Sequence, residues 1–126
     1  MRVMVFGKAT KDTEAGAMPT REAWEAMEQF QEELVKAGIL LVGEGLLPSS
    51  AGARIRPAGK DRVVIDGPFA ETKEVVAGYS IWEVKAMAEA IAWANRCPLP
   101  DDGEIELRPI FCYSEEEVSE ILSAAE

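Results

Sequence analysis

The chain has 126 residues, the size of one ordinary domain, and it carries a net charge of −10 with a pI near 4.5. An acidic surface repels phosphate backbones and anionic headgroups, so we expect no nucleic acid and no membrane as partner. No apolar run approaches the roughly 18 residues of a membrane span, and no signal-peptide pattern is present, which together predict a cytoplasmic protein. We expect a single domain over residues 1–126.

Histidine is absent, and this absence limits the chemistry of the chain. It removes the usual proton shuttle near neutral pH, the Ser-His-Asp triad, the Cys-His pair and histidine metal sites. The two cysteines, Cys97 and Cys112, lack zinc-motif spacing, and we expect them to be buried or half-buried thiols. We therefore expect no metal and no cofactor. Any acid–base chemistry must use Asp, Glu, Lys, Tyr or Cys.

The first third of the chain predicts strand, loop, helix and strand. Residues 2–8 are apolar on both faces, which is typical of a central strand, and residues 11–18 have loop composition. A helix is predicted from the N-cap Thr20 to Gly38. Its apolar stripe consists of Ala23, Met27, Phe30 and Leu34. A short strand over 39–42 then precedes a glycine-rich loop.

The middle of the chain predicts a β-hairpin followed by a long strand. Residues 53–56 and 62–66 flank turn-forming residues and so predict the hairpin. Pro68 suits the start of a short helical turn over 70–74. Residues 75–84 form the next strand, and again neither of its faces is clearly polar.

The last third predicts a helix, a strand and a short final helix. Residues 86–96 have an apolar stripe of Met87, Ala90, Ile91 and Ala94, and Pro98 ends this helix. Residues 104–112 alternate in polarity, which suits a strand with one exposed face; Ile105, Leu107 and Phe111 form its apolar side. Ser114 and Glu117 have the spacing of a capping box.

The order of these elements, with the hairpin set aside, is that of a split βαβ unit. It predicts an α+β, ferredoxin-like fold (βαββαβ), an antiparallel sheet with both helices on one face and an inserted hairpin. Strands 2–8 and 75–84 would then leave an apolar face uncovered, which monomers rarely tolerate. We expect a sheet-to-sheet homodimer, a dimeric α/β barrel; the alternative is that the final helix and long loops cover this face. The pattern leaves open which set of side chains meets the partner.

Residues 66–74 read DGPFAETKE, which resembles the signature of the DGPF branch of the YCII-related domain family. Residues 94–98 (ANRCP) and 106–109 (ELRP) resemble the C-terminal half of the same family, so the resemblance covers essentially the whole chain. It implies a ferredoxin-like fold that dimerises through its sheets. The related YciI-like branch carries a proposed catalytic His–Asp pair, which a chain without histidine does not have. Some DGPF proteins are associated with extracytoplasmic-function sigma factors, which implies a regulatory context.

Charged residues around the DGPF turn are the candidate site. Asp66 has two interpretations: a carboxylate that accepts backbone N–H bonds in the turn, or a desolvated acid/base beside a pocket. Lys73 and Glu71 either form a solvated turn or contact a ligand. Arg54 and Arg56, on the neighbouring hairpin strand, are either edge residues or ligand contacts.

Two classes of function follow from this reading. The first is binding of a small polar or anionic metabolite where the DGPF turn, the hairpin and the dimer seam converge, with Asp66 as acid/base if the protein is an enzyme. The second is a non-catalytic dimeric interaction or regulatory module, favoured by the absence of histidine and of any cofactor motif.

Overall fold

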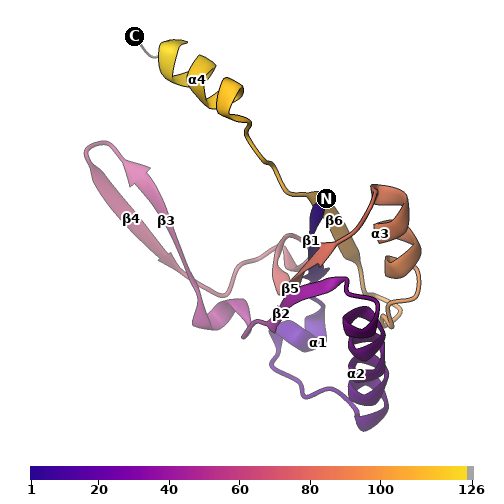
Figure 1. Ribbon diagram of the computed structural model, residues 1–126. Coiled ribbons are helices and arrows are strands. Elements are labelled where there is room, and N and C mark those ends of the chain that lie inside the picture. Colours follow the sequence, from indigo (N-terminus) through magenta and orange to yellow (C-terminus); the bar gives the residue numbers. More distant parts are fainter. Residues whose placement is uncertain (125–126) are drawn as a thin grey trace.

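The computed structural model describes residues 1–124 and contains a four-stranded antiparallel sheet with helices α2 and α3 on one side (Figure 1). The strand order is β2-β5-β1-β6. The strands are β1 (Arg2–Lys8), β2 (Leu40–Gly45), β5 (Val76–Glu83) and β6 (Ile105–Pro109), and the helices are α2 (Arg21–Lys36) and α3 (Met87–Ala94). The α+β class is thereby confirmed, and this order is compatible with the predicted ferredoxin-like topology.

The core lies between the sheet and α2. Thr20 caps this helix as predicted, its hydroxyl accepting a hydrogen bond from the Ala23 N–H at 3.1 Å. Phe30 and Leu34 are buried on the sheet side of α2, and the Phe30 ring meets the Trp82 ring edge-to-face at 6.3 Å. The rest of the buried cluster consists of Val3, Val5, Ile39, Val84 and Ala90.

The register decides which sheet face is open, a question that the sequence pattern left unresolved. Val3 and Trp82 are opposite each other and are buried under the helices, whereas Met4 pairs with Ile81 and Phe6 pairs with Tyr79 on the other face. These last four side chains are half-buried. We call their side of the sheet the open face.

Two elements differ from the prediction in the first half of the chain. Residues 11–14 form a short helix, α1 (Lys11–Glu14), because Thr10 and Thr13 cap each other reciprocally. Strand β2 continues to Gly45 rather than ending at residue 42, because it pairs with β5 up to that point. Because the last residues of β2 have the composition of a turn, the sequence did not predict where this strand ends.

The second half also differs in detail. Strand β6 ends at Pro109 because its partner β1 begins at Arg2, opposite that end of the strand, so Phe111 lies outside the strand and is 71% exposed. Helix α3 is shorter than predicted. Its Ala90 is fully buried, but Ile91 is 49% exposed and so does not belong to the core stripe.

Two elements extend away from the body on the side opposite α2 and α3 (Figure 1). The first is the predicted hairpin, β3 (Ala53–Ala58) and β4 (Asp61–Asp66), with η1 (Ser49–Ala51) before it and η2 (Thr72–Glu74) after it. The second is α4 (Glu115–Ala124), whose predicted capping box is confirmed by hydrogen bonds in both directions between Ser114 and Glu117. Within residues 1–124, no helix is long and apolar enough to cross a membrane.

Candidate functional site

On the helix-covered face of the sheet, the side chains become smaller toward one end, where the residues are glycine. Three rows cross this face, and each row contains one residue from β1, one from β5 and one from β2. The rows are Val3–Trp82–Leu40, Val5–Ser80–Gly43 and Gly7–Gly78–Gly45. The first row is packed against α2, whereas the third is glycine throughout and offers the helix no Cβ atom.

A hollow of about 510 Å³ lies between this glycine end of the sheet and α2. Trp24, Met27 and Phe30 line it from the helix, and Trp24 is 62% exposed. Its floor consists of Gly7, Gly43, Gly45, Gly78 and Ser80. We call this space the α2 hollow. It is largely apolar with few polar groups, as small-molecule sites usually are.

At most of these floor positions, neither the backbone conformation nor the available space requires a glycine. Their φ angles are not positive. A Cβ added at Gly45 would meet nothing within 4 Å, and the nearest atoms to one at Gly7 or Gly43 would be 3.8 Å and 3.6 Å away. Only Gly78 is tight, at 3.1 Å from the Glu44 carbonyl oxygen. Glycine inside a strand costs roughly 0.5–1 kcal/mol relative to alanine and often marks the close approach of another group.

Polar side chains are the minority of the α2 hollow lining and include Glu28 and Gln31 from α2 and Glu44 from β2. Ser80 supplies a hydroxyl on the floor, and Cys97 supplies a thiol whose pKa is raised by burial. The Cys97 thiol already donates a weak hydrogen bond to the Pro98 carbonyl oxygen, at 3.8 Å, so it contributes mainly its apolar surface. Trp82 also lines the hollow, and its Nε1 is buried without a hydrogen-bond partner among residues 1–124.

The residues predicted as a site do not converge on one point. Arg54 and Arg56 share one face of the hairpin, whereas Asp66 pairs with Ala53 and lies on the other face. The Asp66 carboxylate is exposed and accepts no hydrogen bond from residues 1–124, so the expected turn-capping bonds are not formed. In the turn itself, the Gly67 N–H donates a hydrogen bond to the Gly52 carbonyl oxygen, at 3.0 Å.

Arg54 alone reaches the hollow expected beside the DGPF turn. Its guanidinium lies over the Phe69 ring, 3.7 Å from the centroid. A shallow hollow of about 510 Å³, here called the Arg54 hollow, includes both residues and Glu74. Glu71 and Lys73 are exposed and do not line it.

Ser49 fastens the DGPF turn to the body. Its hydroxyl accepts a hydrogen bond from the Phe69 N–H at 3.0 Å and donates one to the Glu14 carboxylate. The Ser49 N–H also donates to Glu14, at 2.9 Å. These hydrogen bonds lower the pKa of Glu14 below its ordinary value. The DGPF motif therefore has a structural role through Phe69, whereas the sequence predicted such a role only for Asp66.

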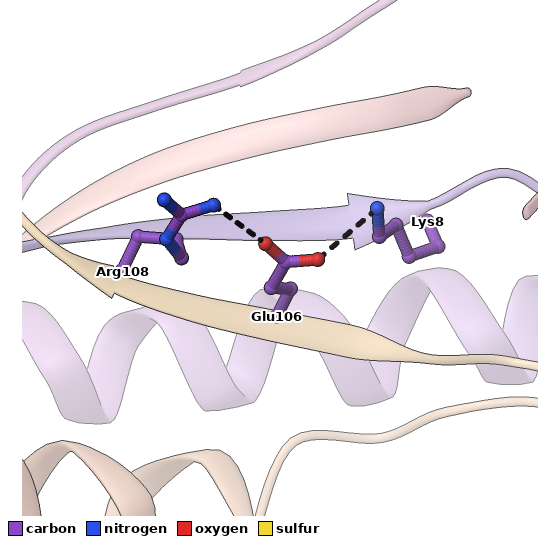
Figure 2. Close-up of polar contacts among 3 residues, drawn as sticks. All are labelled: Lys8, Glu106 and Arg108. Carbon is purple, nitrogen blue, oxygen red and sulfur yellow. Dashed lines mark hydrogen bonds and ion pairs between the residues drawn. The ribbon is translucent and has the colours of Figure 1, made fainter. Parts of the chain in front are cut away.

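A charged cluster borders the open face at the end of β1. Figure 2 shows the Glu106 carboxylate between Lys8, at 3.2 Å, and Arg108, at 3.3 Å. Lys8 makes the largest contribution to a lowered pKa of Glu106, and Arg108 adds to it. Sequence reasoning missed this cluster, although the alternation of Glu106 and Arg108 on one strand face was visible.

Comparison with known proteins identifies the family. The model of the YCII-related domain matches residues 1–116 of this chain. The chain belongs to the YCII-related domain family. This YCII-related chain is 35% identical over 85 residues to an uncharacterised protein of Rhizobium meliloti (strain 1021), an alignment that covers 66% of this chain and 68% of that protein.

Among solved structures, the YCII-related chain is similar to 5-chloro-2-hydroxyhydroquinone dehydrochlorinase from Burkholderia phenoliruptrix AC1100, solved in complex with 2,5-dihydroxybenzoquinone. The identity is 14% and the TM-score is 0.49, with 92% of this chain and 98% of the other covered.

Proposed function

We propose that this YCII-related protein binds a small, largely apolar organic molecule in the α2 hollow. The observation that carries the proposal is the glycine row Gly7–Gly78–Gly45, which leaves the sheet bare beneath a helix that presents Trp24 and Met27. Dense packing is the rule in protein interiors, so an unfilled apolar space at the rim of the core favours an occupant.

The lining indicates the class of ligand. The aromatic rings of Trp24, Phe30 and Trp82 favour a flat or cyclic group, and the Ser80 hydroxyl offers one hydrogen bond to a polar substituent. Glu28 also lines the hollow, on a protein of net charge −10, which disfavours an anion. A neutral ring compound with one polar group fits these features best.

Tryptophan fluorescence and thermal shift test this proposal, because Trp24 and Trp82 both line the α2 hollow. A library of neutral cyclic compounds should yield a ligand that changes the emission and raises Tm. Gly45→Val fills the floor where there is free space and should abolish binding while the protein stays folded. Ala58→Leu adds a comparable volume in the hairpin and is the matched control. Binding that survives Gly45→Val would place the site elsewhere.

The Arg54 hollow is the second candidate, for a small anionic metabolite. It is favoured by one contact: the Arg54 guanidinium is held over Phe69, which keeps a fixed positive charge at the rim. Arg54→Ala should abolish binding of such an anion, and Arg56→Ala, on the same hairpin face but outside the hollow, is the matched control. The proposed acid/base role of Asp66 requires that Asp66→Asn abolish any turnover while binding persists.

We also propose that two copies pair through the open face. Met4, Phe6, Tyr79 and Ile81 form an apolar set on it and are half-buried in a single chain. Pairing would remove this set from water without disturbing the helices. The final helix is not the alternative cover in this structure, because α4 has no buried residue.

A further inference from the structure

Helix α4 carries an apolar face that residues 1–124 do not cover. Val118, Ile121 and Leu122 lie at helical spacing on one side and are 41%, 52% and 65% exposed. Isolated helices shorter than about 12 residues are marginal in water. The stability of α4 as a helix therefore calls for a partner surface.

The β3–β4 hairpin has the same deficiency. Ile55 and Val64 are directly opposite each other on one face and are 68% and 61% exposed. An isolated two-stranded hairpin is at best marginally stable in water. Both projecting elements are thus apolar on one side, and both need a cover.

Their charges are complementary. Residues 53–66 contain four basic residues against two acidic ones, so the hairpin as a whole is positive on an otherwise acidic protein. Arg62 and Asp66 share the face of Ile55 and Val64, whereas Arg54 and Arg56 lie on the opposite face. Helix α4 has no basic residue, and its four glutamates are Glu115, Glu116, Glu117 and Glu120. Opposite charge raises the rate and specificity of association between two surfaces.

The two elements leave opposite ends of the sheet. The hairpin precedes β5, whose first residue Val76 pairs with Lys8 at the end of β1. Helix α4 follows β6, whose last residue Pro109 pairs with Val3 near the start of β1. In a pair of copies that meet at their open faces, a two-fold axis across the strands brings opposite ends of the two sheets together. Both elements extend on the side where the second copy would lie (Figure 1).

We propose that α4 of each copy docks on the β3–β4 hairpin of a second copy of this chain, with Val118, Ile121 and Leu122 against Ile55 and Val64. The inference rests on the proposed pairing through the open face and adds a reciprocal exchange of the two projecting elements. Each element then covers the apolar face of the other.

Analytical sedimentation of the full chain tests whether docking of α4 stabilises the dimer. Leu122→Glu puts a charge into the docking face and should raise the dimer Kd by at least about tenfold. Ser123→Glu adds the same charge to the opposite side of the helix from Ile121 and should leave the Kd within about twofold. Equal dimer affinities for the two variants would overturn the inference.

A disulfide experiment tests whether docking occurs between copies. In a Cys97→Ser, Cys112→Ser background, one tagged copy carries Ile55→Cys and a differently tagged copy carries Leu122→Cys. Mild oxidation of the mixture should give a heterodimeric disulfide that neither copy gives alone. A chain carrying both substitutions that closes on itself as a monomer at high dilution would show docking within one chain and would refute the exchange.

Phe6→Glu separates this inference from the pairing on which it rests. If Phe6→Glu gives monomers while Leu122→Glu behaves like Ser123→Glu, pairing through the open face stands and the exchange of α4 is wrong. A wild-type protein that is monomeric throughout the micromolar range would overturn both.

Discussion

Gly67 lies against the main chain of Ser49 so closely that a Cβ added to it would be 1.7 Å from the Ser49 carbonyl oxygen. The obstacle is backbone in a segment where the Ser49 side chain is itself bound to Phe69 and Glu14, so it cannot turn aside as a flexible side chain would. The glycine of the DGPF motif is therefore a packing requirement between two loops that are far apart in the sequence.

Gly67→Ala should consequently be strongly destabilising. We expect a loss of about 2–3 kcal/mol in the free energy of unfolding, the upper part of the range for overpacking at a site that cannot relax. Gly45→Ala is the matched control, because its Cβ meets nothing within 4 Å and it should be neutral or stabilising by about 0.4–1 kcal/mol. Urea unfolding of both variants measures the difference, and equal midpoints would contradict the packing argument.

The Ser49–Glu14 contact should make stability depend on pH in one direction. Because hydrogen bonds from Ser49 lower the pKa of Glu14 in the folded chain, its contribution is complete above the ordinary carboxyl pKa and is lost as pH falls through the lowered value. Glu14→Gln should therefore melt below wild type near neutrality, and the gap should close as the pH falls below the ordinary carboxyl range. Asp12→Asn removes a neighbouring carboxylate on α1 that does not bond to Ser49, and it is the matched control.

Asp66→Ala should change the stability little, by less than about 0.5 kcal/mol, because the exposed carboxylate accepts no hydrogen bond from residues 1–124. Ser49→Ala, by contrast, should cost roughly 1 kcal/mol or more through the lost bond to the Phe69 N–H. Thermal unfolding of the two variants compares them directly. A large loss for Asp66→Ala would restore the capping role that its place in the turn suggested.

The carboxyl group of Glu106 should titrate below the ordinary range for glutamate, and its two basic neighbours should contribute unequally. Lys8 makes the largest contribution, so Lys8→Met should raise the pKa of Glu106 more than Arg108→Met does. NMR titration of the side-chain carboxyl carbon in the wild type and both variants measures the order. A larger effect of Arg108→Met would contradict this order of contributions.

Element order, the caps at Thr20 and Ser114, and the hairpin could be predicted from the sequence because each has a local signal. The end of β2 could not, because Gly43 and Gly45 have loop composition and are strand residues only through pairing with β5. For the same reason the sequence did not predict the α2 hollow, because its floor forms only when pairing aligns glycines from separate strands.

The charged candidates near the DGPF turn show the other limit. Proximity in sequence suggested that Asp66 and Arg54 would meet, but strand alternation places them on opposite faces of the hairpin. Only a register can decide this, and a hairpin register depends on the turn, which here includes Gly59 at a positive φ of 64°. Arg54 lines the hollow expected beside the DGPF turn, and Asp66 does not.

The proposed pairing through the open face gives the last prediction. Phe6→Glu places a charge among Met4, Tyr79 and Ile81, where a partner sheet would have to desolvate it, so the dimer should dissociate at micromolar concentration. Val35→Glu, at a 60% exposed position on α2, adds the same charge on the helix side and should leave the dimer intact. Light scattering gives both masses, and circular dichroism shows whether each variant is folded. A folded Phe6→Glu protein that remains dimeric would place the interface on another surface.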